Sequence, residues 1–243
     1  MKGYSTFALP ALAVALLLTP SAARPATPQR FTAAVIATNP IAYYTLQATH
    51  GKSEVGTTSY TSQGGVFIAA PGAPVRQNNH CLKLNGTDGM ITTTQVGGIG
   101  SSGSIMAWVN LQELPSKADH YFYVAGESNT GNDFDVQFET DDALRFYTAS
   151  GAHTEFKPAS NTLLNHWHMI VVTFDAAGRR AIFWDGKLAA MDAEGGTPNK
   201  TTAFTIGAST VFSGRWFRGC IDDVALWNKV LNSGEVSALY RAR

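Results

Sequence analysis

Short runs of alternating hydrophobic and polar residues fill the chain from residue 81 to residue 227. They are rich in β-branched and aromatic residues, and Asn-Gly and Asp-Gly pairs separate several of them. The clearest runs are SIMAWVNL (104–111), DFDVQFET (133–140), LRFYTA (144–149), WHMIVVTF (167–174) and RRAIFW (179–184). About a dozen such strands at regular spacing predict an all-β antiparallel sandwich, with a first strand at 41–46.

The pattern is different near both ends of this region. Residues 49–80 are polar and Gly-rich, and they predict little regular structure beyond a short strand near 66–68. One helix is expected at the C-terminal end, where Ser233 can cap it and Glu235 suits its first turn. Val236, Leu239 and Tyr240 would share one face of this helix.

The N-terminal segment has the features of a secretory signal. Residues 7–18 form an apolar run that is too short to span a bilayer, and small residues follow up to Ala23. We therefore expect a signal peptide at 1–23, a Pro-rich lead-in at 24–38 and a single domain at 39–243. The alternative is an uncleaved anchor. Cleavage would make the protein secreted or extracytoplasmic, in the periplasm or at the cell surface.

Charge excludes some classes of partner. The 243 residues include 18 Lys+Arg and 18 Asp+Glu, so the net charge is +0. No basic field is present to gather nucleic acid or an anionic membrane, and no later segment resembles a membrane span.

Two cysteines in an exported chain favour one disulfide over a thiol site.

Several segments together carry a family resemblance. SIMAWVN, NHWHMIVVTFD, AIFWDGKLAA, FTIGA and FRGCIDDVALWNKVLNSGEVSALY occur in this order, and YYTLQ and CLKLNG precede them. The set resembles the laminin-G-like jelly-roll domains of the concanavalin A-like lectin/glucanase superfamily. This resemblance implies two curved antiparallel sheets and, in most relatives, a binding role without catalysis. It does not name a ligand, because the fold hosts many functions.

The resemblance also implies a position for both cysteines. In such domains the strand matching CLKL lies beside the strand matching CIDDV, which would place Cys81 opposite Cys220 in a cross-strand disulfide. The alternative is a pair of free thiols. A redox pair lacks support, because no Cys-x-x-Cys arrangement is present.

Asp222 is the candidate metal ligand. Strand alternation predicts that it points inward with Val224 and Leu226, whereas Asp223 would face solvent. Related domains often place calcium near this aspartate, so Ca²⁺ is the one candidate cofactor. The Asp-Ser-Gly of relatives is missing from the N-terminal loop, although Glu54 lies nearby. Backbone N–H groups could satisfy Asp222 instead.

A candidate ligand face involves three runs of strand. Alternation places the polar residues of each run on one side, where tyrosine rings and planar polar groups would suit a sugar or a peptide. These residues are Tyr121, Tyr123, Asp135, Gln137, Glu139, Arg145 and Tyr147. A plain solvated face would show the same alternation. Carboxylates at this spacing could also serve a glycoside hydrolase, but the Glu-x-Asp-x-x-Glu motif of glucanases is absent.

His166 and His168 could face one metal, but no third ligand is evident nearby, and the family pattern implies that Trp167 between them belongs to the core.

Taken together, the sequence predicts an exported, non-catalytic module that binds a glycan or an extracellular or cell-envelope protein. The alternatives are a glycoside hydrolase of the same fold and a purely structural or adhesion module.

Overall fold

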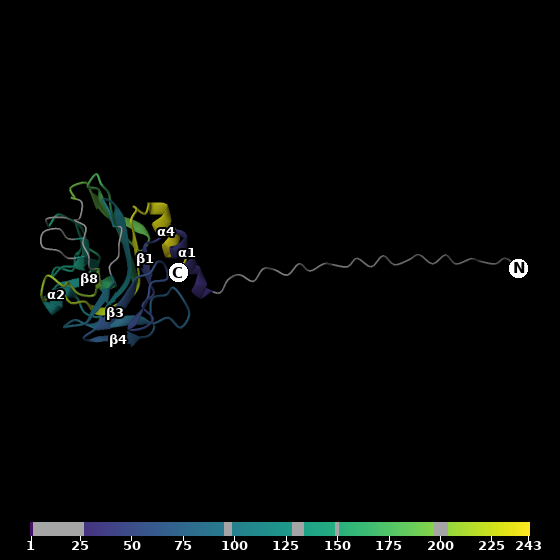
Figure 1. The fold of residues 1–243 in the computed structure, drawn as a ribbon, viewed down its shortest axis with the longest axis horizontal. Coiled ribbons are helices and arrows are strands. Elements are labelled where there is room, and N and C mark those ends of the chain that lie inside the picture. Colours follow the sequence, from purple (N-terminus) through teal and green to yellow (C-terminus); the bar gives the residue numbers. More distant parts are fainter. Residues whose placement is uncertain (2–26, 95–98, 128–133, 149–150, 197–203) are drawn as a thin grey trace.

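Two antiparallel sheets, which we name sheet A and sheet B, form the body of the protein (Figure 1). The computed structural model describes Met1 and residues 27–94, 99–127, 134–148, 151–196 and 204–243. Within these residues, sheet A contains, in spatial order, β14 (Lys187–Asp192), β13 (Arg180–Trp184), β12 (His168–Phe174), β7 (Gly103–Leu111), β16 (Arg218–Trp227), β5 (Cys81–Asn85) and β4 (Val66–Ala69), with β1 (Ala42–Tyr44) paired to β16. Sheet B contains β11 (His153–Phe156), β10 (Leu144–Thr148), β9 (Phe134–Phe138), β8 (Phe122–Glu127), β15 (Thr205–Ile206), β6 (Met90–Thr93), β3 (Ser59–Gln63) and β2 (His50–Lys52).

One apolar cluster fills the space between the sheets. Alternate residues of β7, such as Ile105 and Val109, meet alternate residues of β9, such as Phe134, Val136 and Phe138. All five side chains are buried. Period-2 alternation therefore places one face of each strand in a shared core, as the sequence predicts, and the jelly-roll sandwich is confirmed.

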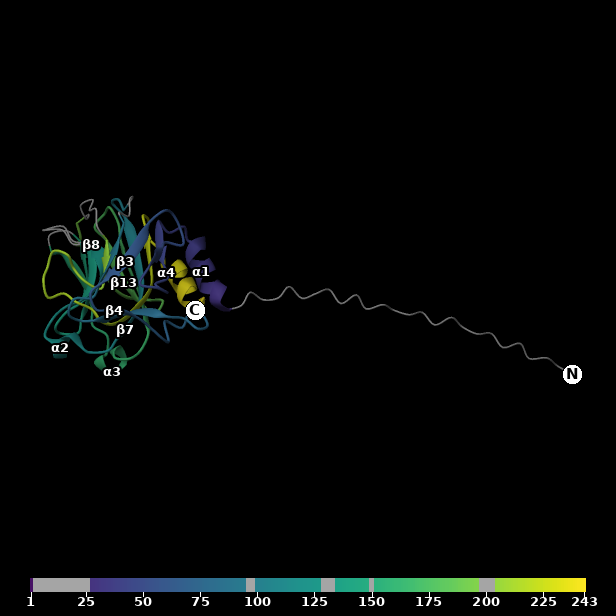
Figure 2. The same cartoon turned by 60° about the horizontal axis from the view of Figure 1, so that its bottom comes forward.

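A second apolar cluster covers the outer face of sheet A. The helices α1 (Thr27–Ala37) and α4 (Ser233–Arg241) lie side by side on this face, and β8 lies on the opposite side of the molecule (Figures 1 and 2). The indole of Trp108 on β7 meets Phe31 of α1 edge-on and stacks on Tyr240 of α4. The sequence pattern did not predict α1, which lies within the expected lead-in 24–38.

The C-terminal helix confirms one prediction and corrects another. Glu235 lies in the first turn as expected, but the N-cap is Asn232 rather than Ser233. The Asn232 side chain accepts a hydrogen bond from the Glu235 N–H, and the Glu235 carboxylate accepts one from the Asn232 N–H. This capping box fixes where α4 begins.

Residues 49–80 contain more regular structure than predicted. The strand expected near 66–68 is present as β4, but β2 and β3 form a further pair at the edge of sheet B.

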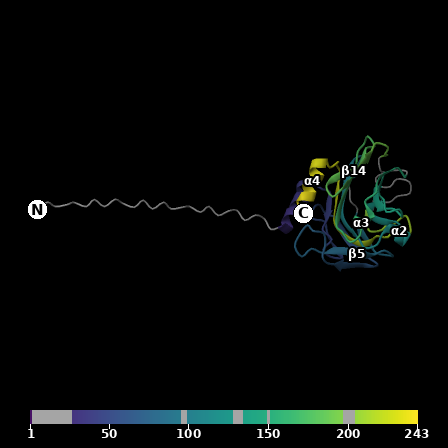
Figure 3. The same cartoon turned by 180° about the vertical axis from the view of Figure 1, so that it is seen from behind.

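Two short helical turns, α2 (Pro115–Ala118) and α3 (Ser160–Leu163), lie at the end of the molecule away from α4, where Figure 3 shows them. Asp185 and Gly186, one of the Asp-Gly pairs, form the tight turn between β13 and β14, and both residues have positive φ.

The expected signal peptide at 1–23 lies outside the described residues, apart from Met1. No helix in the described part of the chain is long and apolar enough to cross a membrane.

Candidate functional site

The outer face of sheet B carries the predicted ligand residues. Phe134, Val136 and Phe138 of β9 point into the core, so Asp135, Gln137 and Glu139 project from the opposite face. The three polar side chains are only 0%, 1% and 5% exposed, respectively. The alternative of a plain solvated face is therefore wrong for β9.

The strands β8, β9 and β10 are neighbours, as the candidate face required. Gln137 lies opposite Tyr123 on β8 and Arg145 on β10, and Asp135 lies opposite Tyr147. Tyr123 shares this outer face, as predicted, but its side chain is fully buried there. The predicted set thus divides into a buried layer of Tyr123, Asp135, Gln137 and Glu139 and a partly exposed layer of Tyr121, Arg145 and Tyr147.

Glu139 joins the two layers. Its Oε1 accepts hydrogen bonds from the Gln137 amide at 2.7 Å and the Tyr147 hydroxyl at 2.9 Å. Its Oε2 lies 3.2 Å from the Arg145 guanidinium, which also binds Glu155 at 2.6 Å. Burial and the Glu139 charge raise the pKa of Tyr147 to about 12, so this tyrosine stays a neutral donor. Both carboxylate oxygens of Glu139 are therefore engaged by side chains of the same face.

Two residues that the sequence did not single out extend the exposed layer. The Arg215 guanidinium donates a 2.9 Å hydrogen bond to the side-chain amide oxygen (Oε1) of Gln137. It also lies 4.1 Å from the Phe212 ring centroid and 5.2 Å from that of Tyr121. These cation–π contacts fix a planar cation between two rings. We name Tyr121, Arg145, Tyr147, Phe212 and Arg215 the sheet B layer.

The aspartate pair of β16 lies on the other side of the molecule. A β-bulge between Asp222 and Ala225 interrupts the alternation, and Asp223 adopts a positive φ of 47°. Asp222 is opposite Trp108 on the outer face of sheet A, whereas Val224 belongs to the inner core. The predicted orientations were therefore wrong: Asp222 does not point inward with Val224, and Asp223 is fully buried rather than facing solvent.

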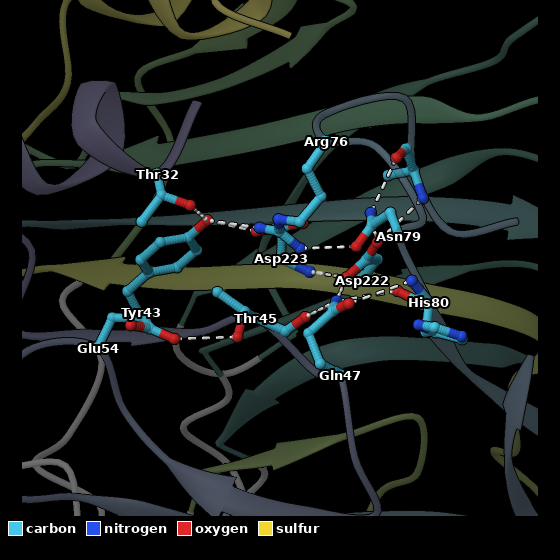
Figure 4. Close-up of polar contacts among 11 residues, drawn as sticks. Thr32, Tyr43, Thr45, Gln47, Glu54, Arg76, Asn79, His80, Asp222 and Asp223 are labelled. Carbon is cyan, nitrogen blue, oxygen red and sulfur yellow. Dashed lines mark hydrogen bonds and ion pairs between the residues drawn. The ribbon is translucent and has the colours of Figure 1, made fainter. Parts of the chain in front are cut away.

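Donors from the segment between β4 and β5 and from the backbone of β16 itself satisfy Asp222 (Figure 4). Its Oδ2 accepts hydrogen bonds from the Ala73 N–H at 2.9 Å and the Asn79 amide at 2.6 Å. Its Oδ1 accepts one from the Asp223 N–H at 2.9 Å. Asp222 therefore holds the 70–80 segment, which we name the covering loop, against sheet A.

Asp223 has a different set of partners. Arg76 of the covering loop lies 2.5 Å from its Oδ1, and the Tyr43 hydroxyl donates to the same atom. Burial raises the pKa of both aspartates, and for Asp222 the adjacent Asp223 charge raises it further. Arg76 opposes this shift for both. The pair retains a proton to a higher pH than an exposed aspartate would.

The residues around Asp222 do not fit calcium. Calcium needs six to eight oxygen ligands, whereas the oxygens of Asp222 face N–H donors from Ala73, Asn79 and Asp223. Glu54 instead accepts a hydrogen bond from Thr45. Among the residues described, no cluster of three His, Cys, Asp or Glu side chains is arranged to hold a metal.

Protein atoms also occupy both ring nitrogens of His168. One nitrogen lies 2.8 Å from the Asp185 carboxylate, and the other lies 2.9 Å from the Thr162 carbonyl oxygen. His166 is exposed, and its Nδ1 lies 2.8 Å from the Leu164 carbonyl oxygen. Trp167 packs against the apolar cluster on the outer face of sheet A, as expected of a core residue, but it is only half-buried.

Cys81 and Cys220 are buried neighbours on β5 and β16. The register places Cys220 opposite Lys83, so the two cysteines are diagonal rather than directly opposite as predicted. Both are thiols in this structure, and a hydrogen bond between them raises the pKa of Cys81 and lowers that of Cys220. Contact between the side chains is compatible with a disulfide, which stays a prediction.

We expect the exported protein to contain this disulfide. In the chain-entropy model, a link between residues 139 positions apart in the sequence contributes roughly 5 kcal/mol to stability. Mass spectrometry after alkylation in denaturant, without reductant, should detect no modified cysteine. Prior reduction should expose two, which serves as the control. Two alkylated thiols in the unreduced protein would contradict the prediction.

These sheets and side chains define a two-sheet jelly-roll domain with a polar, aromatic-rich outer face. A family model described as the concanavalin A-like lectin/glucanases superfamily, laminin-G type, matches residues 85–237. The chain belongs to this family. A search of curated protein sequences finds no match.

Solved structures share the fold at low sequence identity. The botulinum neurotoxin serotype D binding domain superposes with a TM-score of 0.67 at 10% identity, covering 86% of this chain and 52% of that domain. The binding domain of Paraclostridial Mosquitocidal Protein 1 gives 0.65 at 13% identity, with coverages of 84% and 52%. This chain therefore spans about half the length of these toxin domains.

Another similar structure is matched over nearly its whole length. Domain 4 of AbnA, a GH43 extracellular arabinanase from Geobacillus stearothermophilus, was solved in complex with arabinotriose. It superposes with a TM-score of 0.60 at 17% identity, covering 82% of this chain and 97% of that domain.

Proposed function

We propose that this protein is an exported, non-catalytic binding module that holds a neutral glycan on the sheet B layer. The observation that carries the proposal is the arrangement of Tyr121, Tyr147 and Phe212 rings beside two guanidinium groups held in place by buried partners. Aromatic rings pack against the apolar faces of sugars, and fixed planar donors recognise hydroxyl groups. Such a surface is largely preformed, which lowers the entropic cost of binding.

The charges around Arg145 favour a neutral ligand at that end of the layer. Arg145 lies within 4.0 Å of carboxylate oxygens of Glu139, Asp141 and Glu155. Its charge is therefore compensated before any ligand arrives. An anionic glycan would meet these carboxylates, and like charges disfavour binding.

The engagement of Glu139 supports binding rather than hydrolysis. A general acid or nucleophile needs a carboxylate oxygen directed at the substrate. Both oxygens of Glu139 instead bind Gln137, Tyr147 and Arg145. The match to a domain solved with arabinotriose adds support for a carbohydrate ligand.

A glycan array with neutral and anionic oligosaccharides tests this function. We expect the wild-type protein to bind neutral glycans, and binding to persist in a chelator because the residues near Asp222 do not fit calcium. Silence across the array, together with binding to an extracellular protein, would favour an adhesion module. Turnover of a polysaccharide that Glu139→Gln abolishes would favour a hydrolase. Either result would overturn the proposal.

Variants of the layer should separate it from the rest of the surface. Tyr147→Ala and Arg215→Ala each remove one contact side chain of the sheet B layer. We expect each to weaken binding of the array ligand by about tenfold or more. Phe67→Ala on β4 is the matched control, because this aromatic side chain is 59% exposed on sheet A. Isothermal titration calorimetry measures the change. Equal affinities for all three variants would contradict the assignment.

A further inference from the structure

A cavity of about 670 Å³ lies between the covering loop and Trp167, away from the sheet B layer. We propose that it is a second binding site, which accepts a single neutral sugar ring. Its size falls in the range of small-molecule sites. One wall is the half-buried indole of Trp167, and the other includes Pro71, Gly72 and Pro74.

The cavity has few polar side chains, and two of them are free to hydrogen-bond a ligand. No hydrogen bond engages the imidazole of His80 or the side-chain amide of Asn78 within the described part of the chain, and both residues line the cavity. In Figure 4 the His80 ring points away from the two aspartates. An apolar ring face with hydroxyls at its edge matches one indole wall and two free hydrogen-bonding groups.

The charge of the cavity favours an uncharged ligand. Arg76 is the sole Lys, Arg, Asp or Glu among its described lining residues. The Arg76 guanidinium donates to Asn79 at 2.8 Å and pairs with the buried Asp223 at 2.5 Å. Its charge and donors are thus directed at the protein, so a carboxylate or phosphate ligand would find no free cation among these residues.

The buried aspartates give the cavity a fixed wall. Asp222 holds the Ala73 N–H and the Asn79 amide, and the Asn79 carbonyl oxygen accepts from the Gly72 N–H at 2.8 Å. These bonds close the covering loop on itself and attach it to β16. A loop fixed before binding loses little conformational entropy when a ligand enters. The conformation of this wall therefore depends on Asp222, even though Asp222 does not line the cavity.

Nuclear magnetic resonance of the ¹⁵N-labelled protein tests the proposal. Methyl glycosides of glucose, galactose, mannose and arabinose are the probes, and glucuronic acid is the anionic comparison. We expect at least one neutral glycoside to shift the indole signal of Trp167, one of five tryptophans, in a saturable way. The shift should persist in Tyr147→Ala, because Tyr147 belongs to the sheet B layer and does not line the cavity. No shift of this signal with any glycoside, or an equal shift with glucuronic acid, would overturn the inference.

Two variants locate the ligand within the cavity. Trp167→Ala should abolish binding of the glycoside measured through the remaining signals. His80→Ala removes an imidazole that bonds to no described residue, so the fold should be retained, and we expect about fivefold weaker binding from one lost hydrogen bond. Unchanged affinity in His80→Ala would contradict the proposal. If the cavity binds no glycoside, the proposed function still stands or falls by a separate measurement. That measurement is the effect of Tyr147→Ala on binding of the array glycan at the sheet B layer.

Discussion

Replacing Arg76 by methionine is expected to lower the free energy of unfolding by about 3–5 kcal/mol at pH 8. The side chain of Arg76 is 11% exposed, and its partner Asp223 is fully buried. Its loss leaves two adjacent buried carboxylates without their cation. Urea denaturation of both proteins at the same pH measures the difference.

The deficit should shrink as the pH falls. The pKa values of Asp222 and Asp223 are raised in the folded state, by burial first and, for Asp222, by the neighbouring charge second. A raised folded-state pKa contributes stability that is complete below the ordinary aspartate pKa and is lost as pH rises through the raised value. Without Arg76 these values rise further, so the Arg76→Met variant should recover stability between pH 8 and pH 5.

A surface arginine provides the control. The Arg179 side chain is 68% exposed and pairs with Asp175 at 2.6 Å. Arg179→Met should cost less than about 1 kcal/mol, with no comparable recovery toward pH 5. An Arg76→Met variant as stable as Arg179→Met at pH 8 would show that the aspartate pair does not depend on Arg76.

The second large effect on stability is expected at the edge of sheet A formed by β13 and β14. Arg180 on β13 is 2% exposed and binds Asp192 on β14 with two nitrogens at 2.9 Å. Thr148 and Thr154 of sheet B complete the contact, so this cluster joins the two sheets. Asp192→Asn should lower the unfolding free energy by about 3 kcal/mol, because it leaves a buried guanidinium unpaired.

A double variant distinguishes an unpaired charge from lost packing. Arg180→Met with Asp192→Leu removes both charges, and it should be more stable than Asp192→Asn alone. Chemical denaturation of the two variants gives the comparison. A double variant less stable than the single one would mean that the ion pair itself stabilises this edge.

Alternation predicted the strands because each has one face in a core. The same rule could not place Asp222 and Asp223, since a bulge adds a residue between Asp222 and Ala225 and reverses the orientation of the residues after it. Nor could it identify Arg76 and Asn79 as their partners, because the covering loop has no periodicity. Helix α1 was missed because the β-branched Thr32, Val35 and Ile36 have low helix propensity, and its stability comes from packing on sheet A.

The candidate ligand face was predicted in part for the same reason. Alternation placed Gln137, Arg145 and Tyr147 on one face, and the strand neighbours bring them together. It could not distinguish the buried layer from the exposed one, because burial there depends on side chains from other strands and loops. Arg215 and Phe212 lie on a loop with no spacing signal, so only the three-dimensional arrangement adds them to the face.

Glycan binding on the sheet B layer can be observed directly in a crystal structure of the protein soaked with the glycan selected on the array. We expect density for a sugar ring in contact with Tyr147 and Arg215, with the Glu139 hydrogen bonds retained. A bound glycan that touches none of the residues of the sheet B layer would contradict the proposed function.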